Sequence, residues 1–256
     1  MPHSLPMLLL FALAAFLYAM VGHGGGSAYL AIMGMTGWPR EEMRVTALTL
    51  NIAVSGLAWL TFLSRGGFRW RLWAFCALGG MPAAWLGGKL GAPAPIFWAV
   101  VGAALLLAAF RTAFPGVLEK RATGSGAPSD FRNPHSAVRI PLLWLPVGAA
   151  LGFVAGACGI GGGVFLGPAL ILAGAATPFE AAGVSAAYIF VNSAAGLSAA
   201  HWPEHWSPSP VLIAVVVVAG ALGAQIGARK ASPLALRRAL GAALTVAAAK
   251  CFMNAF

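Results

Sequence analysis

The chain has 256 residues, of which 60% are hydrophobic and only 9% are charged, whereas about 25% of the residues of a soluble domain are charged. Six acidic and 16 basic residues cannot coat a water-soluble globule of this size, and the mean hydropathy of +0.84 indicates an exterior that faces hydrocarbon. Composition therefore excludes a soluble globule, a disordered chain and, with three cysteines, a disulfide-rich scaffold.

About eight hydrophobic segments follow one another along the chain, and they predict an all-α polytopic membrane protein. A helix needs about 20 apolar residues to cross a bilayer. Two long stretches are interrupted by glycine runs, 5–36 by Gly22-His23-Gly24-Gly25-Gly26 and 141–175 by Gly159-Ile160-Gly161-Gly162-Gly163. Uninterrupted spans are predicted at 43–63, 71–88, 94–110, 180–199, 208–228 and 234–254.

The second half of the chain resembles the first. The two glycine runs match at an offset of 137 residues; Thr46 and Ala47 match Ser185 and Ala186 at 139. Further matches at an offset of 140 pair Gly80, Gly87, Lys89 and Pro93 with Gly220, Gly227, Arg229 and Pro233. We therefore predict a first transmembrane repeat at 1–110, a polar linker at 111–139 and a second repeat at 140–256, as is typical of secondary transporters.

The distribution of basic residues predicts how the repeats are oriented. The net charge of +10 comes from clusters between apolar runs, which is a topological pattern and not a nucleic-acid site. If both glycine-broken segments turn back as re-entrant hairpins, loops 64–71, 111–139 and 229–238 share one side and carry three, five and four of the 16 Lys and Arg residues. If both segments cross, the split is nine against seven. The stronger bias favours two inverted repeats, each a hairpin plus three transmembrane helices.

Each glycine run predicts a helix start inside the membrane. A broken helix is tolerated there only where its free N–H groups face protein, water or a ligand. The short helices beginning at Ser27 and Val164 each offer free donors and a partial positive charge, so they favour anions. Close packing of small residues is the alternative for a single run. The paired occurrence favours a substrate site formed by Gly24, Gly25, Gly26, Ser27, Gly161, Gly162 and Gly163.

Polar side chains on the following helix of each half are the second element of this site. Thr46 and Asn51 in the first half, and Ser185 and Asn192 in the second, are candidate donors to an anion. Hydrogen bonding between helices is the alternative role for each of them. His23 is the only titratable residue inside either run and is a candidate for carrying a coupling proton, although its counterpart is Ile160. No metal ligand set and no cofactor motif is apparent.

The strings GACGIGGGVFLGPALILAGAATPFEAAGVSAAYIFVNSAAG and VGHGGGSAYLAIMGMTGWPREEMRVTALTLNIAVSG resemble the TauE/SafE family of sulfite and organosulfonate exporters over nearly the whole chain. His23, and Ala31 where the second copy has Pro168, depart from the pattern. The resemblance implies proton- or ion-coupled export of small sulfur-containing or carboxylate anions, such as sulfite or sulfoacetate, across a bacterial inner membrane. It leaves the oligomeric state open.

Three function classes follow from these residues. A secondary transporter that works by alternating access around a central anion site is the leading hypothesis. A passive anion channel would use the same donors. An intramembrane hydrolase is disfavoured, because His23-Gly24-Gly25-Gly26 resembles a lipase oxyanion turn but no Gly-x-Ser-x-Gly elbow accompanies it. The sequence therefore predicts a protein that is not an enzyme.

Overall fold

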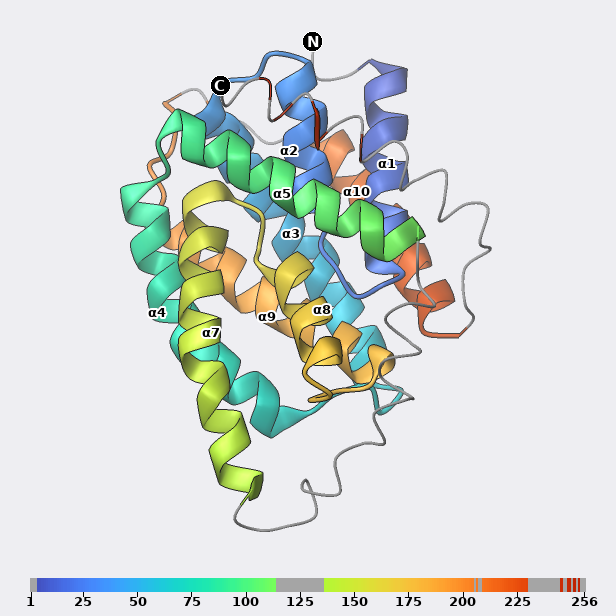
Figure 1. Cartoon of the computed structure of the whole chain (residues 1–256). Helices are drawn as coiled ribbons and strands as arrows, with labels where there is room; N and C mark the ends of the chain where they lie inside the picture. The colour runs from blue at the N-terminus through green and yellow to red at the C-terminus, as the bar shows by residue number, and fades with distance from the viewer. Residues whose placement is uncertain are drawn as a thin grey trace.

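The computed structural model describes residues 4–113, 136–204, 206, 209–229, 245, 248, 249, 251 and 253, and in this part of the chain every regular element is a helix (Figure 1). The elements are α1 Leu5–Ala19, α2 Gly26–Met35, α3 Arg40–Leu63, α4 Trp70–Leu90, α5 Ala94–Ala113, α7 Ser136–Cys158, α8 Gly163–Leu172, α9 Pro178–Ala199 and α10 Pro210–Gly227. The all-helical prediction is confirmed.

Three of the described helices, α3, α9 and α10, are long and apolar enough to cross a membrane. They coincide with the spans predicted at 43–63, 180–199 and 208–228. Shorter apolar helices include α1, α2 and α8 and parts of α5 and α7. The segment predicted at 71–88 forms α4, whose apolar content is diluted by glycines, Pro82 and Lys89. The span predicted at 234–254 lies almost wholly outside the described residues.

The ends of the long helices carry the local signals that start them. At α9, Thr177 and Glu180 form a capping box, in which the Thr177 hydroxyl accepts from the Glu180 backbone N–H and the Glu180 carboxylate accepts from the Thr177 N–H. Helix α3 follows Pro39 and carries two acidic residues in its first turn, where they complement the helix dipole. These ends fix where the central helices begin.

Both glycine-broken segments fold back on themselves. In Figure 1, α1 descends from the N-terminus and α2 returns toward the same end, whereas α7 rises and α8 descends. Each short helix contacts the longer helix before it. Helices α2 and α8 have 10 residues each, about 15 Å of length, which is half of a hydrocarbon core. They begin at Gly26 and Gly163, one residue earlier than predicted, because the last glycine of each run already has helical geometry.

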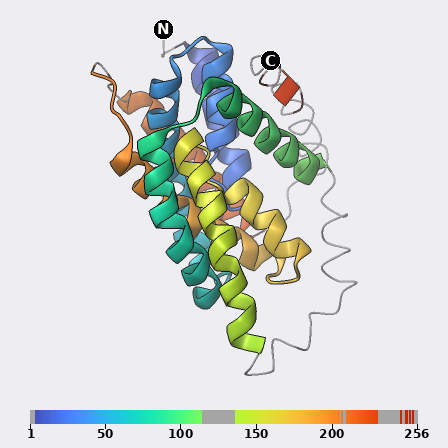
Figure 2. The same cartoon turned by 60° about the vertical axis from the view of Figure 1, so that its left-hand side comes forward.

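The helices of the two halves exchange partners. Helix α7 packs mainly on α4, and α1 packs mainly on α10, while α3 and α9 pack on each other at the centre (Figures 1 and 2). Glycines make both exchanged contacts close: a Cβ at Gly87 would overlap the Phe153 carbonyl oxygen, and one at Gly227 would overlap that of Met20. Such backbone-to-backbone approach is how small residues join helices in membranes.

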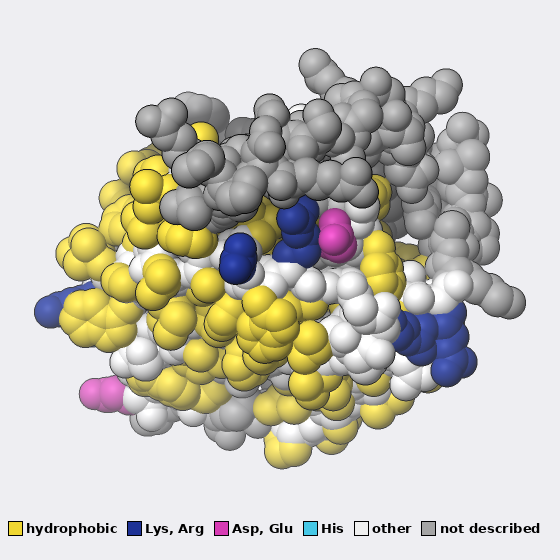
Figure 3. All heavy atoms as spheres, turned by 90° about the horizontal axis from the view of Figure 1, so that it is seen from below, with side chains coloured by type: hydrophobic (Ala, Val, Ile, Leu, Met, Phe, Trp, Pro, Cys, Tyr) yellow, Lys and Arg dark blue, Asp and Glu magenta, His cyan; other side chains and the backbone are white. Residues whose placement is uncertain are grey.

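Helix α5 lies obliquely over the bundle and contacts α2, α7 and α8 (Figures 1 and 2). Large apolar side chains are exposed on several helices, among them Leu9 of α1, Leu143 of α7 and Val218 of α10. Seen from the end opposite the N-terminus, the described surface is mostly hydrophobic, with few charged side chains (Figure 3). An exterior of this kind suits a multi-pass membrane protein.

Candidate functional site

The two glycine runs share a left-handed backbone conformation at two matched pairs of glycines, although Gly161 also has a positive φ and its counterpart Gly24 does not. Gly25 and Gly162, which stand just before α2 and α8, have φ angles of +96° and +76°. An L-residue with a side chain is strained in this left-handed region. Gly22 and Gly159, which are also 137 residues apart, have φ angles of +76° and +80°. The glycine pattern in the sequence therefore reflects a backbone path that both halves share.

Asn51 of α3 lies between the two breaks. A Cβ at Gly24 or Gly26 would come within 2.5 Å of its side-chain amide atoms, and one at Gly161 would come within 3.0 Å of Nδ2. The Asn51 amide donates a long hydrogen bond to the Gly159 carbonyl oxygen, with Nδ2 and O 3.5 Å apart. The structure therefore brings both glycine runs around one fully buried amide.

His23 joins the two breaks directly. Its Nε2 lies 3.0 Å from the Gly163 carbonyl oxygen at the start of α8, and its Nδ1 lies 2.9 Å from the Val21 carbonyl oxygen. A backbone carbonyl only accepts hydrogen bonds, so both contacts are satisfied together only when both ring nitrogens carry a proton. His23, which interrupts the first glycine run, therefore contacts Gly163, the last glycine of the second run.

Several polar side-chain atoms around the breaks are buried without a partner. Among the described residues, Asn51 Oδ1, Ser185 Oγ and Ser193 Oγ are unpartnered beside the breaks, and Asn192 Nδ2 and Oδ1 are unpartnered on α9 where a Cβ at Gly80 of α4 would lie 2.9 Å from Oδ1. All four residues are fully buried, and a Cβ at Gly161 would lie 3.4 Å from Ser193 Oγ. An unpaired buried polar group costs about 1–3 kcal/mol. Such a concentration at one place indicates a site built to take a polar ligand or water.

Two other predicted residues already have partners. The Ser27 hydroxyl at the start of α2 lies 3.1 Å from the Tyr18 hydroxyl. The Thr46 hydroxyl accepts from Trp206 Nε1 at 2.9 Å, in the segment after α9.

Ser185 lies next to the second break, where a Cβ at Gly163 would be 3.1 Å from the Ser185 carbonyl oxygen. The predicted glycines, His23, Asn51 and Ser185 are therefore brought together, and Thr46 is engaged by a different segment.

Arg44 is a candidate site residue that the sequence pattern did not single out. It lies within the predicted span at 43–63, yet its side chain is only 7% exposed. Its Nε is buried without a hydrogen-bond partner among the described residues. A charged residue inside an apolar helix is a functional-site hypothesis on its own, so this signal was available in the sequence. The roles of Tyr18 and Trp206 depend on packing and carried no such signal.

The Ser193→Ala variant tests whether the orphaned hydroxyls serve a ligand. Because Ser193 Oγ has no partner, its removal is expected to leave stability unchanged or to raise it by about 1 kcal/mol. Anion flux is expected to fall several-fold, because a donor is lost. Thermal unfolding and flux measured on the same preparation check both parts, and Ser198→Ala, at an exposed hydroxyl that donates to the Ala195 carbonyl, is the control. Unchanged flux would remove Ser193 from the site.

The groups around the breaks include hydrogen-bond donors that suit an anion. In the described residues no group of three His, Cys, Asp or Glu side chains is placed to hold a metal ion. The donors around the breaks are amides, hydroxyls and backbone N–H groups at two helix N-termini, and these bind negative charge without a fixed counter-charge. The arrangement can therefore hold an anion and release it again.

Comparison with known proteins gives two matches. The family model "Sulfite exporter TauE/SafE" matches residues 7–251. A curated protein of Sinorhizobium fredii, "Probable membrane transporter protein y4hK", is 35% identical over 245 residues, which cover 94% of each chain. No solved structure matches the chain.

Proposed function

The chain belongs to the TauE/SafE family of sulfite exporters, and on that basis we propose that it is a secondary transporter that exports small sulfur-containing oxyanions across a bacterial inner membrane. Sulfite and organosulfonates such as sulfoacetate are the substrates proposed. The observation that carries the proposal is the meeting of two helix N-termini around Asn51, among polar atoms that lack partners in the described chain.

Alternating access is the proposed mechanism. Two inverted repeats, each with a re-entrant hairpin, would rock around a central anion site. The exchanged packing supports this relation, because the contact of α4 with α7 is matched by that of α10 with α1, and the contact of α2 with α3 by that of α8 with α9. The opposite directions of α1 and α7 in Figure 1 support the inversion. In this mechanism the absence of side chains at Gly24 to Gly26 and Gly161 to Gly163 lets the anion reach the backbone N–H groups once the side chains packed against these glycines move aside.

His23 is the proposed carrier of the coupling proton. Protonation lets it donate to both the Val21 and the Gly163 carbonyl oxygens, which ties the first break to the start of α8. Loss of one proton removes one of the two donors. A proton on His23 therefore favours the arrangement in which the two breaks are joined, and this is the kind of differential contact that coupling requires.

Flux into proteoliposomes tests the proposal. Purified protein is reconstituted, and uptake of labelled sulfite, sulfoacetate and sulfate is followed with and without an imposed proton gradient. Saturable flux that the gradient accelerates is the expected result. Flux that only dissipates the gradient of the anion, without saturation, would favour a passive anion channel instead. Absence of flux for all three anions would overturn the proposed substrate class.

His23→Gln is expected to remove the acceleration by the proton gradient and to keep saturable exchange of anions. Glutamine retains one donor for the Gly163 carbonyl but does not titrate. Counterflow with labelled and unlabelled sulfoacetate measures exchange, and gradient-driven uptake measures coupling. Arg71→Gln is the control, because that exposed residue lies outside both breaks. Gradient-driven uptake that persists in His23→Gln would exclude His23 as the coupling group.

A further inference from the structure

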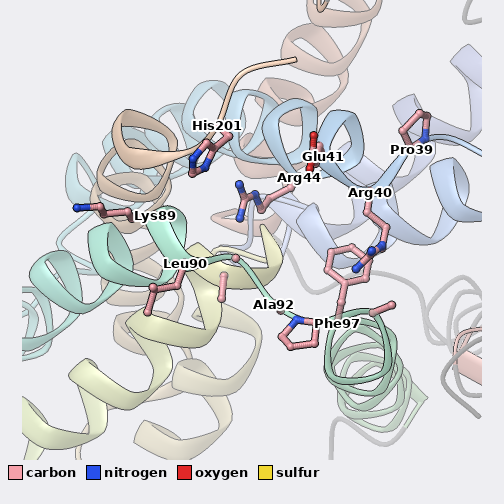
Figure 4. A pocket seen from close by; sticks show the side chains of 13 residues that line it. Pro39, Arg40, Glu41, Arg44, Lys89, Leu90, Ala92, Phe97 and His201 are labelled. Carbon is pink, nitrogen blue, oxygen red and sulfur yellow. The ribbon is translucent and has the colours of Figure 1, made fainter. Parts of the chain in front are cut away.

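A cavity of about 620 Å³ opens at the end of the molecule where α3 begins and α4 ends (Figure 4). Helix α3 contributes Arg40, Glu41 and Arg44, and His201 lies in the segment after α9. The other walls come from the turn between α4 and α5, the start of α5 and the end of α7. Four stretches that are separate in the sequence therefore line this space, which we call the Arg44 cavity.

Arg44 is the unusual member of the cavity. Its side chain is 7% exposed and its Nε is buried without a hydrogen-bond partner in the described chain. Glu41 lines the same cavity, yet within the described residues no ion pair joins the two. The negative charge of Glu41 favours the Arg44 cation, but the buried Nε–H has no acceptor in the described chain, and a buried donor without a partner is costly. A planar fork of N–H donors matches the oxygens of a carboxylate, sulfonate or sulfite group.

Glycines make room for this guanidinium. A Cβ at Gly91, which ends α4, would come within 2.9 Å of Arg44 Nη1, and one at Gly159 would come within 3.1 Å of Arg44 Cγ. Arg44 and His201 both line the cavity (Figure 4). Side chains at Gly91 or Gly159 would therefore collide with Arg44, and without them the Arg44 side chain fits in the wall of the cavity.

The charges around the cavity favour an anion. Three cations, Arg40, Arg44 and Lys89, face one carboxylate, Glu41. Lys89 lies at the edge, with its ammonium 5.4 Å from the centre of the Trp85 ring. The predicted topology leaves only four of the 16 Lys and Arg residues on this side of the membrane, and three of the four line this cavity. Topology does not require cations on this side, so their concentration needs another reason.

The Arg44 cavity adjoins the two breaks. Gly159 belongs to the second break, and it contacts Arg44 on one side and accepts from Asn51 on the other. Asn51 follows Arg44 by seven residues, which is two turns of α3, so both residues lie on one face of that helix. The Arg44 cavity therefore lies at the end of the bundle, and Arg44 connects its lining to the second break through Gly159.

We propose that the Arg44 cavity is a second anion subsite, a vestibule in which Arg44 holds a small sulfonate or sulfite ion at one end of the transport path. This inference rests on the proposed function. The guanidinium neutralises the anion as it leaves or enters water, and Arg40 and Lys89 raise the local anion concentration. The central breaks, where the donors are amides, hydroxyls, backbone N–H groups and His23, receive the anion from this vestibule or pass it on.

Thiol labelling tests the subsite without relying on transport. Leu90 lines the cavity and is 65% exposed, whereas the three native cysteines are buried. In a Leu90→Cys protein in detergent, rates are measured for an anionic ethylsulfonate and a cationic trimethylammonium methanethiosulfonate reagent. The anionic reagent is expected to react faster, and sulfoacetate is expected to slow it. Arg44→Gln should lower the anionic-to-cationic rate ratio at least threefold, and Arg71→Gln, an exposed arginine at the far end of α4, should not change it.

Transport measurements distinguish a failure of the proposed Arg44 subsite from a failure of the proposed function. Arg44→Gln is expected to raise the KM for sulfoacetate about tenfold, because a charge-assisted contact is lost, and Arg71→Gln is expected to stay within twofold of the unmodified protein. If Arg44→Gln does not fold, protection by sulfoacetate in Leu90→Cys alone decides the question. Absence of that protection, or an unchanged rate ratio and KM in Arg44→Gln, would overturn the subsite. Absence of flux in the unmodified protein overturns the proposed function instead, and sulfoacetate protection then marks a bound anion outside any transport path.

Discussion

Replacing Gly25 with alanine is expected to abolish anion flux and to destabilise the protein by about 2–5 kcal/mol. The backbone at Gly25 has a φ of +96°, and an added Cβ would lie 2.6 Å from Tyr29 Cζ. Tyr29 is fully buried and stacked on Phe11, with ring centroids 5.4 Å apart, so it has little room to move. Left-handed geometry costs about 1–2 kcal/mol for a residue with a side chain, and overpacking adds about 1–3 kcal/mol.

Gly37→Ala is the matched control for this prediction. Its φ is +78°, but nothing lies within 4 Å of an added Cβ, so the variant reports the backbone cost alone. Thermal unfolding and proteoliposome flux are measured on both variants. Gly25→Ala should lose clearly more stability than Gly37→Ala, and only Gly25→Ala should lose flux. Equal losses in the two variants would show that the packing around the first break does not matter.

Asn51→Asp is expected to reduce anion flux by roughly a thousandfold, the second large effect. The side chain keeps its shape but gains a negative charge between the two breaks, where a Cβ at Gly24, Gly26 or Gly161 would nearly touch the amide. Two unit charges 4 Å apart repel by about 4 kcal/mol at an effective dielectric constant of 20. That energy corresponds to about three powers of ten in anion affinity.

Asn51→Ala separates charge from packing. It removes the same amide and its long hydrogen bond to Gly159 but adds no charge, so a smaller loss of flux, of about tenfold, is expected. Sulfoacetate uptake at a fixed external concentration measures all three proteins, after size-exclusion chromatography has shown that each is monodisperse. Equal flux in Asn51→Ala and Asn51→Asp would place the anion away from Asn51.

The helices were predictable where the sequence carries local signals. The apolar runs that became α3, α9 and α10 are continuous, and the glycine runs that precede α2 and α8 forbid an undisturbed helix. The family was predictable from the same doubled strings, and its model matches residues 7–251. The repeat division at 1–110, 111–139 and 140–256 and the inverted topology stay predictions.

The contacts within the site were predictable only in part. Asn51 and His23 stand out as polar residues in apolar surroundings, so the sequence singled them out. No sequence pattern indicates that His23 reaches the Gly163 carbonyl, 140 residues away, or that Trp206 occupies the Thr46 hydroxyl. Arg44 was overlooked because the charge count assigned it to topology, whereas its burial and its orphaned Nε become visible only in three dimensions.

The exchange of helix partners bears on how the chain reaches its final form during synthesis. Helix α1 is made first, yet its main partner α10 begins about 190 residues later, at Pro210. Gly223 and Gly227 of α10 lie against the backbone carbonyls of Phe16 and Met20, at the end of α1. These carbonyls must therefore stay exposed to lipid until nearly the whole protein has been inserted. Contacts so distant in sequence form slowly. The predicted first repeat is therefore not expected to fold as a separate unit, and a chain truncated after α5 is expected to be degraded.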